Sequence, residues 1–322
     1  MTTRIRRYTH HAVVVTLLVA LGVGGLAVAL ARPGPHASGQ PGSAAAGSRN
    51  NSAHGANASP RCSGPTGAAY LAEAGYQAFA AVETANCDLV QTYNVDDPQV
   101  PGDAGDYDYS GTDEGLALSD GTLWFAVTGS NNVAAIETSQ LNPKNYSPAE
   151  KLIAVGWNPE ALAVTPNGKQ VWVADTGPQT TTSPVSGLTV IDAATYKVIA
   201  SLPLAGNPTD VAFTPTGTHA YVTTSQGLYA YDTASRKMVW HTSGLGDPES
   251  VVSSPNGHVL YVTLTSENEL ATINPSNGHV MHTTWIGHLP WQCAVSPNGS
   301  TVYVAAPDSD AVIVVDAATG KV

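Results

Sequence analysis

Acidic side chains recur at the start of successive copies of a repeated sequence pattern, with tryptophans close by. Carboxylates beside aromatic rings can hold a cation, a sugar or the basic tip of a peptide. The candidate ligand-binding residues at these positions are Glu114, Glu160, Asp210, Glu249 and Gln292, together with Trp157, His288 and Trp291. The alternative interpretation is that these acids only cap or solvate the beginning of a strand.

Other candidate chemistry is sparser. Asp103, Asp106 and Asp108 have the oxygen ligands and spacing that suit Ca²⁺, but they lack the EF-hand pattern, so an acidic loop is the competing interpretation. Neither a Cys-x-x-Cys-His haem motif nor a Gly-x-Ser-x-Gly nucleophile turn occurs. Of the histidines, His288 alone is placed beside the recurring acids, so a hydrolase or lyase would depend on it.

The elements that position these residues are short strands separated by regular turns. Each copy has a proline, then a turn such as Ser296-Pro297-Asn298-Gly299, then a β-rich run such as Thr301–Ala305. Proline presets φ in the turn, and Asn-Gly tolerates positive φ. The turn glycines of four copies are Gly168, Gly217, Gly257 and Gly299, so the period is 40 to 49 residues. Four short strands at this period predict the blades of an all-β propeller.

The repeat resembles the YVTN β-propeller repeat family. Tyr221-Val222-Thr223-Thr224 and Tyr261-Val262-Thr263-Leu264 carry the namesake motif, and Val190–Thr195 fits the segment that follows it. The resemblance covers roughly residues 68–322. It implies a propeller of four-stranded antiparallel blades, commonly seven of them, and it says little about function because propellers host many unrelated activities.

The blade boundaries follow from laying the copies over one another. We expect six blades, partly or fully present, at residues 62–95, 112–156, 157–206, 207–246, 247–288 and 289–322. The first would lack its first strand and the last its fourth, which predicts that the chain is a fragment of a longer, seven-bladed protein. The alanine-rich residues 68–81 could instead form a helix.

The amino-terminal 61 residues have a different composition. Arg4, Arg6 and Arg7 precede an uncharged apolar run at residues 12–31, which predicts either a secretory signal peptide or a membrane anchor. Residues 32–61 are rich in Gly, Ser, Ala and Pro and are expected to form a disordered linker. Either alternative for the apolar run places the remaining chain outside the cytoplasm, secreted or anchored to the membrane only through this segment.

Charge limits the partners of the predicted propeller. The first 61 residues hold six of the 13 Lys and Arg and none of the 25 acids, so residues 62–322 have seven basic and 25 acidic residues, a net charge of −18. This balance disfavours nucleic acid and anionic lipid, whose phosphates need clustered Lys and Arg. It suits cationic small molecules, basic proteins or peptides, or Ca²⁺, although acidic exported proteins can owe their charge to solubility alone.

The three cysteines divide into a candidate pair and a single residue. Cys62 and Cys87 fall in turns at the same end of the first blade, so a disulfide between them is geometrically plausible and suits an oxidising compartment. Cys293 is expected to be a small buried hydrophobic residue on an inner strand. The sequence as a whole favours an exported binding or scaffold module with its ligand at the channel mouth. A lactonase-like hydrolase or a lyase with its site at the same mouth is the alternative.

Overall fold

The computed structural model describes residues 68–73, 78–83, 89–94, 116–127, 130–140, 150–177, 186–306, 309 and 311–322. Within these ranges the regular elements are β-strands and one 3₁₀ turn, η2 (Thr138–Gln140), and Ser130 and Ser309 are also in 3₁₀ conformation. None of the described helical segments is long and apolar enough to cross a membrane. The predicted signal or anchor at residues 1–31 and the linker at 32–61 lie outside the described residues.

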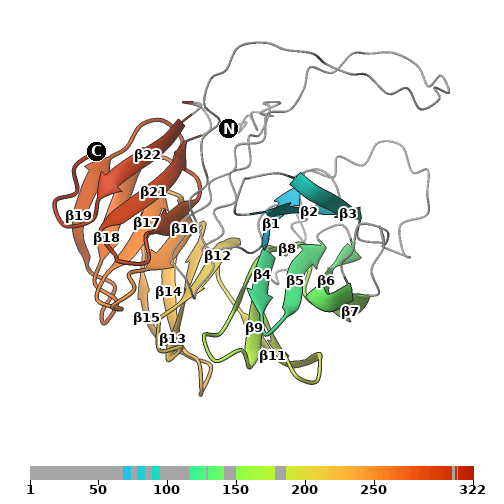
Figure 1. Ribbon diagram of the computed structural model, residues 1–322. Helices are drawn as coiled ribbons and strands as arrows, with labels where there is room; N and C mark the ends of the chain where they lie inside the picture. Colours follow the sequence, from blue (N-terminus) through green and yellow to red (C-terminus); the bar gives the residue numbers. More distant parts are fainter. Residues whose placement is uncertain are drawn as a thin grey trace, which may run out of the picture.

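The strands fall into six antiparallel sheets in chain order (Figure 1). The first is three-stranded, with β1 (Ala68–Glu73), β2 (Ala78–Glu83) and β3 (Leu89–Asn94). The second has β4 (Leu116–Ser119), β5 (Thr122–Val127), β6 (Asn132–Glu137) and β7 (Glu150–Ala154). The third has β8 (Pro159–Val164), β9 (Gln170–Asp175), β10 (Gly187–Asp192) and β11 (Lys197–Pro203).

The remaining three sheets repeat this arrangement. The fourth has β12 (Pro208–Phe213), β13 (His219–Thr224), β14 (Gly227–Asp232) and β15 (Lys237–Thr242). The fifth has β16 (Pro248–Ser253), β17 (Leu260–Leu264), β18 (Glu269–Ile273) and β19 (Val280–Trp285). The sixth has three strands, β20 (Cys293–Val295), β21 (Thr301–Ala306) and β22 (Ala311–Asp316).

Each sheet is an up-and-down meander, and consecutive sheets touch through their first strands. The contacts run from β4 to β8, from β8 to β12, from β12 to β16 and from β16 to β20. First strands that are neighbours around an axis, with later strands lying further out, are the arrangement of β-propeller blades. The predicted fold class is therefore confirmed. The strand prediction for residues 68–94 is also confirmed, and the helix alternative for residues 68–81 is wrong because β1 and β2 occupy that segment.

The repeated turn joins neighbouring blades as well as neighbouring strands. In the sixth sheet, Ser296 Oγ donates to Asn298 Oδ1 at 2.7 Å, and the same oxygen accepts the backbone N–H of Ser300 at 3.0 Å. The turn glycine then has positive φ, 72° at Gly299. A Cβ at Gly217 would lie 3.0 Å from Cδ of Pro166, the proline in the preceding blade's turn. The turn sequence therefore also shapes the contact between blades.

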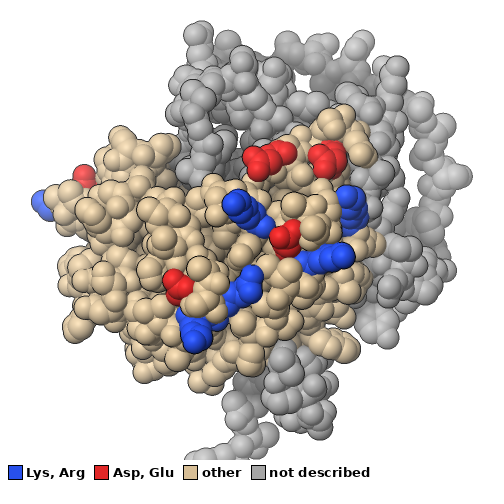
Figure 2. Space-filling view, turned by 90° about the horizontal axis from the view of Figure 1, so that it is seen from below, with Lys and Arg blue, Asp and Glu red and all other residues tan. Residues whose placement is uncertain are grey.

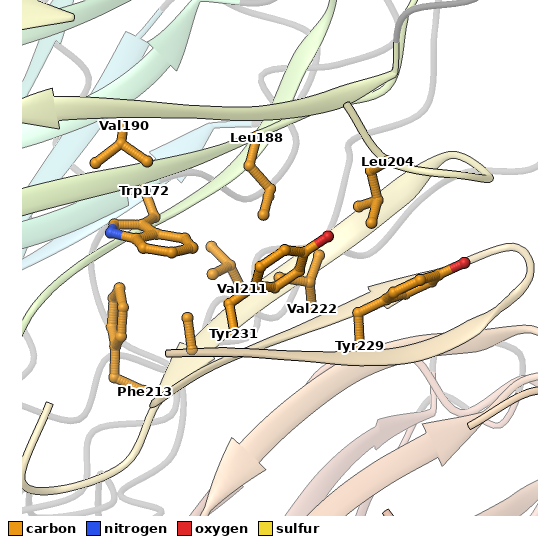
Figure 3. Packing of buried hydrophobic residues seen from close by; sticks show 10 residues of the cluster. Trp172, Leu188, Val190, Leu204, Val211, Phe213, Val222, Tyr229 and Tyr231 are labelled. Atoms are coloured by element: carbon orange, nitrogen blue, oxygen red, sulfur yellow. The ribbon is translucent and has the colours of Figure 1, made fainter. Parts of the chain in front are cut away.

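The core lies between the faces of adjacent blades. In Figure 3, Trp172 of the third sheet faces Phe213 and Tyr231 of the fourth, and Leu188 and Val190 lie beside it. The Trp172 ring meets Phe213 edge-on, with ring centroids 5.9 Å apart. Its indole N–H donates to Gln170 Oε1 at 3.0 Å. Trp172, on the second strand of the third blade, therefore stabilises the packing of this blade on the fourth.

The turn contact predicts a measurable difference between two glycines. Gly217→Ala and Gly244→Ala both place a side chain at positive φ, 70° and 76°, which costs about 1 kcal/mol for a non-glycine residue. Gly217→Ala also forces its Cβ against Pro166, whereas nothing lies within 4 Å of a Cβ at Gly244. We expect Gly217→Ala to be the more destabilising in chemical unfolding. Equal destabilisation by the two variants would contradict a role for the turn in joining blades.

Candidate functional site

The acids at the start of the inner strands are positioned by β-bulges. In the third, fourth and fifth sheets the register of the first strand shifts by one residue just after its initial proline, at Pro159, Pro208 and Pro248. A bulge re-aims the side chains next to it, and proline fits the first position of a strand because no ladder N–H is needed there. The end of each blade at which its first strand begins is called here the mouth end, and the opposite end the turn end.

Asp210 connects the fourth and fifth blades. Its Oδ2 accepts hydrogen bonds from Ser250 Oγ and from the backbone N–H of Val251, both at 2.9 Å. Its Oδ1 accepts the N–H of Val211 at 2.7 Å. Burial raises the pKa of Asp210 in spite of these three bonds, which by themselves would lower it. Oδ2 therefore holds β12 against β16 of the next blade, whereas Oδ1 bonds within β12 itself.

The hydrogen bonds continue into the sixth blade. Ser250 is fully buried, and Gln292 Oε1 lies 3.2 Å from its Oγ as a second acceptor for its single hydroxyl proton. The same Oγ accepts the backbone N–H of Cys293 at 3.3 Å. Cys293 is buried on β20, which confirms the prediction made for it, and burial raises the pKa of its thiol to about 12. A polar network thus links β12, β16 and β20 at the mouth end.

The carboxylate of Glu249 is hydrogen-bonded to a tryptophan rather than to a neighbouring strand. Trp291 Nε1 donates to its Oε1 at 2.8 Å. Burial is the main cause that raises the pKa of Glu249 to about 7, the Trp291 bond opposes it, and the negative charges of Glu160, Asp210 and Asp247 raise it further. The structure therefore brings the predicted residues Glu160, Asp210, Glu249 and Trp291 within electrostatic or hydrogen-bonding range of one another.

Two other predicted residues lie elsewhere at the mouth end. His288 is exposed in the connection between β19 and β20, and its ring meets Trp285 of the outer strand edge-on, with centroids 6.3 Å apart. Trp157 is 58% exposed in the connection between β7 and β8, where it lines a pocket. Glu114, Cys62, Cys87, Asp103, Asp106 and Asp108 lie outside the described residues. The described part of the chain holds no group of three or more His, Cys, Asp or Glu suited to a metal ion.

Charge is divided between the two ends of the blades. The described acids at the mouth end are Glu160, Asp175, Asp210, Asp247, Glu249, Glu267 and Glu269. The described basic residues all lie at or next to the turn end, namely Lys151, Lys169, Lys197, Arg236, Lys237 and Lys321. Figure 2, the view from below, shows Lys and Arg gathered with Asp and Glu on the turn end. Within the described ranges the mouth end therefore has acids without any Lys or Arg.

The sequence interpretation missed Asp175, the last residue of β9. It is 2% exposed, and Thr189 Oγ1 donates to its Oδ2 at 2.6 Å. Its Oδ1 is buried with no hydrogen-bond partner. The equivalent last residues in the second, fourth, fifth and sixth sheets are Val127, Thr224, Leu264 and Ala306. A carboxylate at a position that is apolar or threonine in these four sheets was a signal that comparison of the repeats could have found.

Comparison with known structures supports the fold. One similar structure is a crystal structure of a functionally unknown protein from Desulfotomaculum acetoxidans DSM 771, with a TM-score of 0.59 and 14% sequence identity over 74% of this chain and 72% of that one. At this identity the likeness concerns the fold alone. Kuenenia stuttgartiensis hydrazine synthase aligns over 74% of this chain and 89% of that one with 16% identity, but its TM-score of 0.46 supports no argument.

Comparison of sequences identifies a family. No curated protein sequence matches the chain significantly. The model of the choice-of-anchor I domain matches residues 69–298, which span the first sheet through the start of the sixth. This match covers more than half of the chain. The protein therefore belongs to the choice-of-anchor I domain family.

Proposed function

We propose that this protein is an exported propeller module that binds a basic peptide or protein segment at its mouth end. The observation that carries the proposal is the division of charge, with seven described acids and no described Lys or Arg at that end. Glu249 is the central acceptor, because its pKa is raised to about 7 by burial and by three neighbouring acids. A Lys or Arg side chain of the ligand would favour the ionised carboxylate and so lower the pKa of Glu249 again.

The residues at the mouth divide into two roles. Asp210 has both oxygens hydrogen-bonded, Oδ2 to β16 of the next blade and Oδ1 within β12, and serves as a positioning residue for β16. Glu249 and Glu160 are the ligand-facing acids, and Trp291 holds the Glu249 carboxylate in place through its indole N–H. This division narrows the expectation from sequence, in which all the recurring acids were equivalent ligands.

Membership of the choice-of-anchor I family supports a cell-surface or extracellular location. A signal peptide or anchor at residues 1–31 is the element that would export the chain. The resemblance to YVTN repeats is carried by the motifs at Tyr221 and Tyr261, and it agrees with a binding role rather than naming a ligand. The alternative of a hydrolase or lyase would require His288 to act together with the mouth acids, and no described contact joins them.

A binding experiment tests the proposal. We expect a tetralysine peptide to bind the full chain at low ionic strength, and to bind less tightly as salt screens the charges. Binding should strengthen as the pH rises from 5 to 8, because Glu249 becomes ionised near pH 7 and the peptide remains cationic. Glu160→Gln combined with Glu249→Gln should weaken binding about tenfold or more, since close charge pairs at interfaces are worth 1.5 kcal/mol or more.

Asp316→Asn provides the control, since it removes an acid at the turn end and should leave peptide affinity unchanged. Fluorescence anisotropy of a labelled peptide measures all three proteins. Equal affinity of the double variant and the unmodified protein would refute the mouth as the peptide site. Turnover of a lactone that depends on His288 would favour the alternative function instead.

A further inference from the structure

A recess lies on the third blade, and none of Glu160, Asp210 and Glu249 lines it. It has a volume of about 380 Å³ and is bounded by the connection from β7 to β8 on one side and by β10 and β11 on the other. This volume is within the range of small-molecule sites in proteins. Its walls are mainly apolar, with Leu188, Val198 and Leu202 among them, and its polar groups include Asp175 and Thr189.

Asp175 is the feature of this recess that the fold alone does not explain. The carboxylate is almost fully buried, and while Oδ2 accepts from Thr189, Oδ1 has no partner. A buried polar atom without a hydrogen bond costs about 1–3 kcal/mol, so such groups call for an explanation. The equivalent positions in the second, fourth, fifth and sixth sheets hold Val127, Thr224, Leu264 and Ala306, so a propeller blade of this protein folds without a carboxylate there.

The backbone around Asp175 is arranged to keep the carboxyl group enclosed. A Cβ at Gly156 would lie 2.5 Å from Cγ of Asp175, so only glycine lets the connection pass directly over the side chain. The Gly156 N–H donates to Thr189 Oγ1 at 3.3 Å, and Thr189 in turn donates to Asp175. Gly156 and Thr189 therefore hold the carboxyl group in one orientation at the wall of the recess.

Trp157 supplies the remaining recognition element. It follows Gly156 directly, lines the recess, and leaves 58% of its surface exposed. The face of an indole ring attracts organic cations, and a buried carboxylate attracts them more strongly. The described mouth end, to which both residues belong, contains no Lys or Arg that would repel or compete with such a ligand.

We propose that this recess binds a small organic amine, with its ammonium group on the unpartnered oxygen of Asp175 and its apolar body between Trp157 and the aliphatic wall. The ammonium group supplies the hydrogen-bond donor that Oδ1 lacks. Apolar surface of the ligand covers Leu188, Val198 and Leu202. None of Glu160, Glu249 and Trp291, the residues assigned to peptide binding, lines this recess, so either proposal can fail without the other.

The probe for this site is phenethylamine, compared with 2-phenylethanol, which has the same ring and chain length but no charge. Isothermal titration calorimetry of the full chain at pH 8 should show the amine binding at least about tenfold more tightly than the alcohol, because a charge-assisted hydrogen bond is roughly twice as strong as a neutral one. Asp175→Asn should bring the two affinities together. Trp157→Ala should weaken amine binding about 2- to 30-fold, in line with cation–π energies.

Trp285→Ala is the matched control, since Trp285 is 63% exposed on β19 and does not line the recess. It should leave the affinity for phenethylamine unchanged, and circular dichroism should show that all variants are folded. Equal binding of amine and alcohol, an amine affinity unaffected by Asp175→Asn, or no binding of the amine at millimolar concentration would each overturn the proposal. Amine binding that depends on Glu249 but not on Asp175 would also overturn it, because the ligand would then occupy the mouth.

Discussion

Replacing Trp172 with alanine is expected to lower the free energy of unfolding by about 3–5 kcal/mol, as truncation of buried aromatic residues does. Trp172 is fully buried between the third and fourth sheets, where it contacts Phe213 and Tyr231. Its removal would leave a cavity between two blades and free Gln170 from its hydrogen bond. Urea unfolding followed by circular dichroism measures the loss.

Trp285→Ala removes the same side chain from an exposed position and should change the free energy of unfolding by about 0.5 kcal/mol or less. The difference in unfolding free energy between the two variants gives the cost of the cavity, apart from any general effect of removing a tryptophan. A Trp172→Ala protein as stable as the Trp285→Ala protein would show that the packing between these two blades contributes little to stability.

The second large effect depends on pH and concerns Asp175. Burial raises its pKa from 3.8 to about 7 in the folded protein, so between these values the folded state holds a proton that the unfolded state has released. The stability contributed by this group therefore decreases as the pH rises from about 4 to 7. Asp175→Asn removes the titration, and its stability relative to the unmodified protein should increase over this interval by up to about 4 kcal/mol.

Thermal unfolding of both proteins at pH 4, 6 and 8, without added ligand, measures this difference. Asp192→Asn is the control of opposite sign, because hydrogen bonds from Thr195 lower the pKa of Asp192 in the folded state. That variant should lose relative stability only as the pH rises to about 4, the usual pKa of the carboxyl group, and should then stay nearly constant up to pH 8. A relative stability of Asp175→Asn that stays constant from pH 4 to 8 would contradict the buried, uncompensated carboxyl group.

The strands and turns were predictable because their signals are local. Proline and Asn-Gly restrict φ in the turns, and Asp316 ends the third strand of its sheet, where its carboxylate accepts the N–H of Thr319 at 2.8 Å. The alanine-rich opening segment was predictable only through the repeat, since helix propensity alone favours the wrong structure. Pairing of β1 with β2 satisfies the backbone there, so tertiary context decides the outcome.

The roles of the mouth residues were not predictable from spacing. Asp210 stands two positions after its proline, whereas Glu160 and Glu249 stand one position after theirs. Because of the bulge at each strand start, this offset of one residue gives the two acids different contacts. Asp210 accepts a hydrogen bond from the next blade, whereas Glu249 accepts one from Trp291. A one-residue shift in a strand redirects its side chains, and sequence alone does not locate the bulge.

The division of charge between the mouth end and the turn end has an electrical consequence. Acids without Lys or Arg at one end, and all the described basic residues at the other, give the described part of the propeller a permanent dipole moment along the direction of its inner strands. An external electric field exerts a torque on such a molecule in addition to a net force. Within about one screening length of an anionic surface, roughly 8 Å at physiological salt, the turn end is drawn inward and the mouth end faces outward. The asymmetry behind the proposed binding of a cationic ligand would therefore also orient the mouth end toward the medium from which such a ligand would arrive.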